Sequence, residues 1–152
     1  MQSICGRYTL TIDKRSIEKY FGAKFYIAQA SYDWTPTLNA APSQMLPIIR
    51  TYATDRIELA RWGFWPEEWK TPVNFAILTT KAKEAVSHIH DRMPVILPLA
   101  REKEWLPPYL TGEFFIPPIS TELLMSYPVT PKMNRATFNE PTAIAPLEPV
   151  IP

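Results

Sequence analysis

Cys5 is the only thiol of the 152-residue chain and the first candidate for chemistry. A lone cysteine is most often a small buried hydrophobic residue, and this is the simpler interpretation. A cysteine at a true N-terminus, however, carries a thiol and an α-amine that together condense with an aldehyde, first to a Schiff base and then to a thiazolidine. The neighbouring Arg7 could hold an anionic group there or lower the pKa of the thiol. Because four residues precede Cys5, this chemistry requires their removal.

His90 is the second candidate, as a group that gives and takes protons at neutral pH. His88 and His90 are two residues apart and would not share a helix face, so a zinc site on a helix is not expected. At a junction between a helix and a strand, one of them could point into a cleft, with Asp91 or a carbonyl fixing its tautomer. A polar turn without a functional role explains the same residues equally well. Arg92 could bind a phosphate with two hydrogen bonds, or pair with Asp91.

The segment 62–69 holds three tryptophans, interrupted by Gly63 and Pro66. Such rings normally belong to a core, yet the two turn residues favour a loop on which a nucleic-acid base could stack. We expect some of the rings in the core and others on such a platform. The adjacent Glu67 and Glu68 are expected to be solvated rather than to act as a catalytic pair, because neighbouring residues need not face one site.

The composition excludes several classes of protein. The chain is 46% hydrophobic and 12% aromatic, which excludes overall disorder. A net charge of +1 excludes a globally basic nucleic-acid binder but leaves room for a local basic groove. One cysteine excludes a disulfide framework and a multi-cysteine zinc site. No apolar run is long enough to span a membrane and no secretory signal is visible, so we expect a cytoplasmic protein without metal, cofactor or membrane partner.

The patterns of apolar residues predict strands and short helices in mixed order, which is typical of an α+β fold. The predicted strands are 5–10, 75–80, 93–97 and 127–130, with a hairpin of 45–50 and 56–62 around Thr54-Asp55. The predicted helices lie between a cap at Asp13 and a stop at Gly22, over 81–87, and as single turns at 101–105 and 121–125. Twelve of the 17 prolines follow residue 93. We therefore expect one domain over 1–152, with extended connections in its proline-rich part, 107–152.

Six short blocks follow one another along the chain and span nearly all of it. The blocks are Cys5-Gly6-Arg7-Tyr8, Asn39-Ala40-Ala41-Pro42-Ser43-Gln44, Arg61-Trp62-Gly63-Phe64-Trp65-Pro66, Ile77-Leu78-Thr79-Thr80-Lys81-Ala82, Ile89-His90-Asp91-Arg92-Met93-Pro94-Val95-Ile96-Leu97 and Tyr127-Pro128-Val129-Thr130. In this order they resemble the SRAP family, the SOS-response-associated peptidases or abasic-site processing proteins, and the first and fifth blocks are specific.

The resemblance implies an α+β fold with a mixed β-barrel core, short flanking helices and a positively charged groove for single-stranded DNA. It also implies a cross-link to abasic sites through a thiazolidine, and a self-cleaving peptidase activity that exposes the cysteine. Carried over by motif, Cys5 is the nucleophile and His90 the acid or base. The implied DNA-binding residues are Arg7 and Arg92 at the backbone, Asn39, Pro42 and Trp62 around the pocket, and Asn74. Asn74 is either the surviving first residue of an Asn-Ala-Arg motif or only the start of the strand that follows.

The chain departs from the family pattern after Trp69. The family follows its Trp-Gly-x-x-Pro segment with Asn-Ala-Arg-Ala-Glu and then with Pro-Ala-Asp-Gly-Phe-Tyr-Glu-Trp, which supplies a catalytic glutamate. Here the chain runs from Asn74 directly into the predicted strand. Losing this block would expose strand edges. The alternatives are a deletion, an error in the gene assignment, or a chain that forms a dimer in which a second copy covers the gap. Besides the abasic-site protein, a catalytically impaired single-stranded DNA-binding protein and a protein-interaction module stay open as alternatives.

Overall fold

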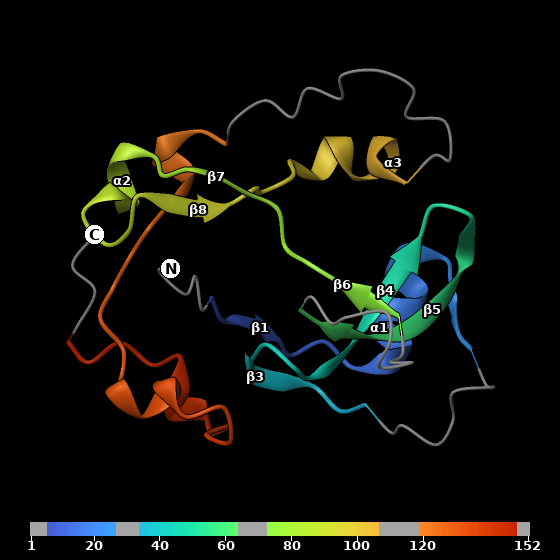
Figure 1. Cartoon of the computed structure of the whole chain (residues 1–152), viewed down its shortest axis with the longest axis horizontal. Coiled ribbons are helices and arrows are strands. Elements are labelled where there is room, and N and C mark those ends of the chain that lie inside the picture. The colour runs from blue at the N-terminus through green and yellow to red at the C-terminus, as the bar shows by residue number, and fades with distance from the viewer. Residues whose placement is uncertain (1–5, 27–33, 64–72, 107–118, 149–152) are drawn as a thin grey trace. The chain divides into compact units, whose positions relative to one another are not determined.

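The computed structural model describes residues 6–26, 34–63, 73–106 and 119–148 (Figure 1). The chain divides into two compact units. The first unit comprises Met1–Ala76 and Pro128–Pro152, and the second comprises Ile77–Tyr127.

Two sheets make up the framework of the first unit. In one, β1 (Tyr8–Leu10) pairs antiparallel with β3 (Thr37–Ala40). In the other, β4 (Met45–Arg50) and β5 (Ala53–Trp62) form an antiparallel hairpin. The short strands β2 (Lys24–Phe25) and β6 (Asn74–Phe75) both run parallel to β5, where β2 pairs near its start and β6 pairs at its end. The central strand β5 therefore organises this unit.

Helix α1 (Lys14–Phe21) forms where the capping residues predict it. The Asp13 carboxylate accepts a hydrogen bond from the backbone N–H of Ser16 at 3.0 Å, which satisfies a donor that has no partner inside the helix. The helix ends at Gly22, whose φ of 66° is a left-handed conformation that glycine adopts without strain. Ile17 faces inward and is buried, while the remaining helix residues are exposed or half-buried.

The hairpin of β4 and β5 is confirmed, but its turn is not at Thr54-Asp55. Arg50 pairs with Ala53, so the turn residues are Thr51 and Tyr52, and Thr54 lies within β5. Turn-forming residue types mark a turn only approximately, because strand pairing decides which two residues remain between the strands.

The second unit contains one small sheet and short helices. Strands β7 (Thr79–Lys81) and β8 (Arg92–Pro94) pair antiparallel and flank α2 (Glu84–Ser87). The predicted single turns are the 3₁₀ helix η3 (Leu99–Arg101) with α3 (Glu102–Trp105), and η4 (Thr121–Leu123). The predicted buried strand 75–80 is wrong, because β6 and β7 belong to different units and Leu78 between them is 57% exposed.

The last described segment is built from turns. It contains the 3₁₀ helices η5 (Pro131–Asn134) and η6 (Pro141–Ala143), and the N–H of Leu147 donates to the carbonyl of Pro128 at 2.9 Å to close the loop. The predicted strand 127–130 is wrong. Pro128 has no N–H for a ladder, and Thr130 caps η5 by accepting a hydrogen bond from Lys132 N at 3.3 Å.

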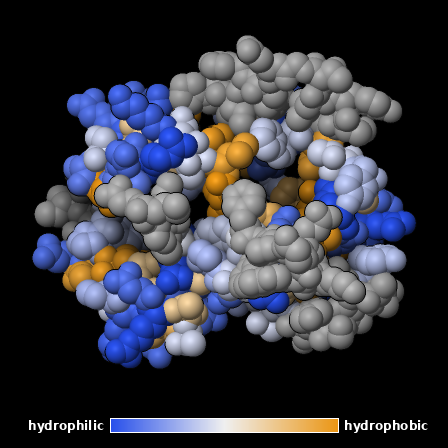
Figure 2. Space-filling model, in the orientation of Figure 1, coloured by the Kyte–Doolittle hydropathy of each residue, from blue (hydrophilic) through white to orange (hydrophobic). Residues whose placement is uncertain are grey.

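Buried hydrophobic residues lie mainly in the first unit, around β5. Of the described part of the second unit, Met93 is the only buried hydrophobic residue. On the visible surface in Figure 2, orange hydrophobic residues also lie among blue hydrophilic ones. The buried hydrophobic residues of the first unit are Ile17, Ala23, Trp34, Ala40, Ala41, Leu46, Ile57, Leu59, Ala60, Trp62 and Ala143.

The α+β class is confirmed by these mixed helices and sheets. The expected barrel is not confirmed, because the described strands form three separate sheets and close no barrel among themselves. In the described ranges, no helix has both the length and the apolar character needed to cross a membrane.

Candidate functional site

The residues singled out from the sequence fall into two groups, one on each unit. Arg7, Asn39, Pro42, Trp62 and Asn74 belong to the first unit, whereas His90 and Arg92 belong to the second. The predicted nucleophile Cys5 lies outside the described residues. The glutamates and the other two tryptophans of the segment 62–69 lie outside them as well.

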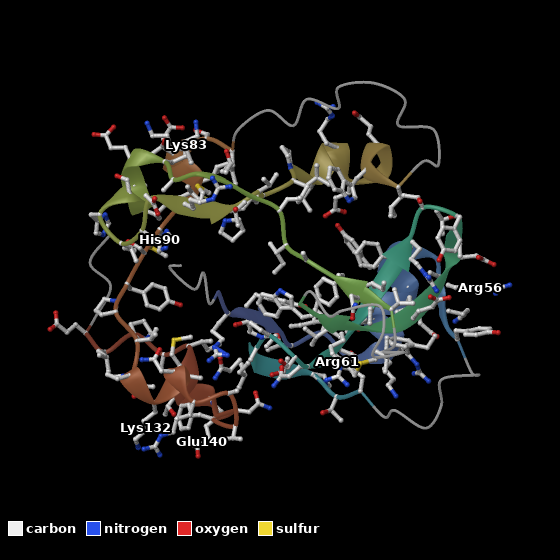
Figure 3. All side chains as sticks on the ribbon, viewed as in Figure 1. Arg56, Arg61, Lys83, His90, Lys132 and Glu140 are labelled. Carbon is white, nitrogen blue, oxygen red and sulfur yellow. The ribbon has the colours of Figure 1, made fainter. Side chains whose placement is uncertain are left out.

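Arg7 is the residue before β1, and its side chain contacts the C-terminal loop of the first unit. Its Nη2 donates a hydrogen bond to the backbone carbonyl of Asn134, at 3.0 Å. A guanidinium has five N–H donors, so this bond fixes the position of the side chain and leaves other donors for a ligand. The side chain is thereby held beside η5, which carries Lys132 (Figure 3).

Asn39 is buried in β3 and uses its amide inside the protein. Its Nδ2 lies 2.9 Å from the carbonyl oxygen of Met133, 3.1 Å from that of Arg135 and 2.9 Å from that of Phe138. Only 1% of the residue is exposed. Its Oδ1 is buried and has no hydrogen-bond partner among the described residues. Asn39 therefore anchors the loop 131–139, and its predicted contribution to a DNA pocket stays a prediction.

Asn139 is a second anchor of the same loop, and the sequence analysis missed it. Its Oδ1 accepts a hydrogen bond from the N–H of Leu38 at 2.7 Å, and lies 3.2 Å from the hydroxyl oxygen of Thr37. Asparagine side chains often take the place of a backbone partner in this way. Asn139 belongs to no recognisable motif, so only its distant contacts reveal the role.

Pro42 forms the turn that joins β3 to β4. Gln44 N donates to the carbonyl of Ala41 at 3.2 Å, and Ser43 has a φ of 76°. Proline at the second position and positive φ at the third are typical of a type II turn. The turn is held against the end of β5, because Ser43 N donates to Trp62 O at 2.8 Å and Trp62 N donates to Gln44 O at 3.0 Å.

The Trp62 ring lies in the core of the first unit. Its centroid is 5.3 Å from that of Tyr8 and 6.2 Å from that of Phe75, with which it is nearly parallel. The residue is 8% exposed, so the core interpretation applies to this tryptophan. Burial raises the pKa of Tyr8 to about 12, because the charged phenolate would lose its hydration.

Asn74 begins β6 beside this aromatic group. It is paired in register with Arg61 of β5, and the next residue, Phe75, stacks on Trp62. The Asn74 Oδ1 is buried and has no hydrogen-bond partner among the described residues. The side chain of Arg61 donates from Nη1 to the carbonyl of Ser43 at 2.9 Å, which joins this end of the sheet to the Pro42 turn.

His90 follows α2, and its backbone N–H donates to the carbonyl of Val86 at 3.3 Å (Figure 3). Its Nδ1 lies 2.9 Å from the backbone nitrogen of Arg92 and 2.8 Å from Oδ1 of Asp91. The side chain is 42% exposed. Both of these contacts are therefore made by Nδ1 of the imidazole, and neither is made by Nε2.

Arg92 is held by Thr79 across the β7–β8 sheet. Its Nε donates to Thr79 Oγ1 at 2.9 Å, and its Nη2 lies 2.7 Å from both Oγ1 and the backbone oxygen of Thr79. The sequence left open whether Asp91 would pair with Arg92. In the structure Asp91 contacts His90, and the guanidinium contacts Thr79.

The second unit therefore offers an imidazole, that of His90, and a guanidinium held by Thr79, that of Arg92, two residues apart in the chain. The first unit offers another fixed guanidinium, Arg7, and a rigid aromatic core. Among the described residues, no three His, Cys, Asp or Glu side chains gather in a way that could hold a metal ion. Proton transfer and binding of an anion are the chemistry that these side chains can support.

A family model described as SOS response associated peptidase (SRAP) matches the chain in two segments, residues 4–75 and 67–136. No solved structure matches the chain.

Several relatives carry the name abasic site processing protein. YoqW of Bacillus subtilis (strain 168) is 24% identical over 223 residues, which cover 93% of this chain and 99% of that protein. YoqW of Bacillus phage SPbeta is 37% identical over 87 residues, covering 51% of this chain and 39% of its own. YobE of Bacillus subtilis (strain 168) is 30% identical over 134 residues, covering 80% and 58% respectively. Because 223 residues exceed the 152 of this chain, the first relative has residues that this chain lacks.

Proposed function

The chain belongs to the SRAP family, and from this premise we propose that it binds single-stranded DNA with abasic sites and forms a thiazolidine cross-link through Cys5. The main support is that the two matched segments together include Cys5, His90 and every proposed DNA-binding residue. The relatives are named for abasic-site processing, which agrees with this substrate.

An amide nitrogen cannot condense with an aldehyde, so the proposed reaction begins with self-cleavage. One water hydrolyses the Ile4–Cys5 peptide bond, which leaves a carboxylate on Ile4 and a free α-amine on Cys5. The free α-amine then attacks the aldehyde carbon of the opened abasic sugar and gives a carbinolamine. Loss of one water gives the Schiff base, and the thiol adds across its C=N bond to close the thiazolidine. Opening the sugar and losing water both move protons, which is the role proposed for His90.

DNA binding is proposed to combine phosphate contacts with a supporting framework. Arg7 and Arg92 are held by a carbonyl and by Thr79, respectively, so less side-chain entropy is lost when a phosphate binds. The proposed framework that supports the pocket consists of Asn39, Pro42, Trp62 and Asn74. The buried ring of Trp62 agrees better with such support than with insertion between bases.

The missing central segment favours a second candidate function, a catalytically impaired protein that binds single-stranded DNA. The family glutamate has no counterpart in the sequence, so His90 would be the proton-transfer group that remains.

We also propose that a second copy covers edges exposed by the missing block and that the protein works in the cytoplasm. A molar mass measured by light scattering that equals one chain would contradict the dimer.

The cross-link is tested with a single strand from which uracil has been excised. A variant that begins Met-Cys5, so that removal of Met frees the amine, is expected to give a heat-resistant adduct, and Cys5→Ala is expected to abolish it. If this variant binds the strand but forms no adduct, the impaired DNA-binding function is the correct one. If fluorescence anisotropy at low salt shows that the variant has no higher affinity for single-stranded DNA than for duplex DNA, both functions are rejected.

His90 is tested in the same variant against the neighbouring histidine. We expect His90→Ala to slow cross-linking by about 10²–10⁴-fold, the usual contribution of a positioned acid or base, and to leave DNA binding nearly unchanged. His88→Ala is the matched control and should change the rate little. Equal small effects of both substitutions would show that His90 is only a turn residue.

A further inference from the structure

The Nδ1 atom of His90 lies near two partners and can form a hydrogen bond with only one of them at a time. The backbone N–H of Arg92, with its nitrogen 2.9 Å away, can donate to Nδ1 only when Nδ1 carries no proton. The Asp91 carboxylate, 2.8 Å away, accepts a hydrogen bond only when Nδ1 carries a proton. The two contacts therefore favour opposite tautomers of the neutral imidazole.

The tautomer decides which nitrogen can exchange a proton with a substrate. With the proton on Nδ1, the lone pair of the neutral ring is on Nε2, so Nε2 can accept a proton and return it. With the proton on Nε2, the ring's lone pair is engaged by the Arg92 N–H, and Nε2 cannot act as a base. Both contacts that the described residues make with the ring are at Nδ1, so Nε2 is the nitrogen left for a substrate, and it can act as a base only while Asp91 holds the proton on Nδ1.

We propose that Asp91 is a positioning residue that keeps a proton on Nδ1 of His90, so that Nε2 performs the proton transfers. This role rests on the proposed function of His90. A hydrogen bond to a carboxylate is about twice as strong as one between neutral groups, which favours Asp91 over the competing amide. Losing the amide contact costs little, because Arg92 is exposed and water can accept from its N–H.

The effect is moderate because the carboxylate is in solvent. The Asp91 side chain is 80% exposed, and an exposed ion pair supports only a change of about two- to five-fold in a tautomer ratio. The other charged groups on the elements nearest to His90 are Lys81 on β7, Glu84 on α2, Arg92 on β8 and Glu122 on η4. Among the described carboxylates, Asp91 is the one that lies within ion-pair distance of the imidazole.

Nitrogen-15 NMR of the full chain, at a pH where the imidazoles are neutral, measures the tautomers without any DNA. The chain has two histidines, so His88→Ala assigns the signals and His88 is an internal reference. We expect a larger Nδ1–H fraction for His90 than for His88, and an about two- to five-fold fall in the His90 ratio in Asp91→Ala. Asp91→Asn, which keeps the size and removes the charge, should lie between. Glu84→Ala, which removes a nearby charge, should change nothing.

Two results would overturn the proposal. One is a His90 tautomer ratio equal to that of His88 in the unsubstituted protein, and the other is an unchanged ratio in Asp91→Ala. Cross-linking by the Met-Cys5 variant separates this proposal from the function on which it rests. If Asp91→Ala shifts the tautomer while His90→Ala leaves the rate unchanged, the positioning by Asp91 holds and the proton-transfer role of His90 fails.

Discussion

The side-chain nitrogen of Asn39 donates to the carbonyl oxygen of Met133 at 2.9 Å and joins β3 to η5 across 94 positions of the sequence. The same amide group contacts the carbonyls of Arg135 and Phe138. The loop 131–139 is thereby fixed to the sheet that carries Tyr8. The backbone carbonyl that holds Arg7, that of Asn134, belongs to this loop.

We expect Asn39→Ala to lower the free energy of unfolding by about 1–3 kcal/mol, because it removes a buried side chain whose amide group donates to the backbone carbonyls of the loop 131–139. Urea unfolding measures this change. Asn134→Ala is the matched control, since it removes an exposed asparagine side chain from the same loop and keeps the carbonyl that Arg7 uses. A change within about 0.5 kcal/mol is expected for the control. Equal effects of the two substitutions would contradict the anchoring role of Asn39.

Thr79 holds the guanidinium of Arg92 and should affect DNA binding through it. We expect Arg92→Ala to weaken binding to a single strand. The slope of the logarithm of the binding constant against the logarithm of the salt concentration should become less negative by about 0.7, the value for one phosphate contact. Thr79→Val removes the hydroxyl acceptor and keeps the carbonyl, so a smaller loss of affinity is expected. Anisotropy titrations at several salt concentrations measure both. Thr80→Val, on the neighbouring residue of β7, should bind like the unsubstituted protein.

Trp62 should affect stability more than binding. Because its ring is buried and packs against Tyr8 and Phe75, we expect Trp62→Ala to lower the free energy of unfolding by about 3–5 kcal/mol, and Trp62→Phe to lower it less. Denaturant unfolding followed by circular dichroism measures the change without relying on tryptophan fluorescence. Tyr52→Ala, at a turn residue that is 70% exposed, is the surface control. A Trp62→Ala protein of full stability that no longer binds DNA would instead favour insertion of the ring between bases.

The raised pKa of Tyr8 predicts a loss of stability in alkali. Burial raises this pKa from 10.0 to about 12, so the folded state holds the phenolic proton more tightly than the unfolded state. The stabilisation is complete below pH 10 and is lost as the pH rises towards about 12. We expect the melting temperature to fall over this range and the fall to be smaller in Tyr8→Phe, which has no proton to lose. An identical fall in both proteins would show that Tyr8 does not contribute.

Features that depend on nearby residues follow from the amino-acid sequence alone. Asp13 and Gly22 mark the two ends of α1, because a helix end is capped by residues within one turn of it. The apolar runs predict the β4–β5 hairpin, because its strands are neighbours in the chain. The ordered motifs led to the family, and the mixed short elements led to the α+β class.

Features that depend on distant residues follow only from the folded structure. The run 75–80 reads as one strand, but β6 pairs with β5 and β7 pairs with β8, and local hydrophobicity cannot say which strand a segment will join. The spacing of aromatic residues left two interpretations of Trp62, and contacts with Tyr8 and Phe75 decided for the core. Asn39 looked like part of a binding motif, yet its amide is used by carbonyls more than 90 residues later. A side chain's role depends on the groups that folding brings to it, and these are not its neighbours in the sequence.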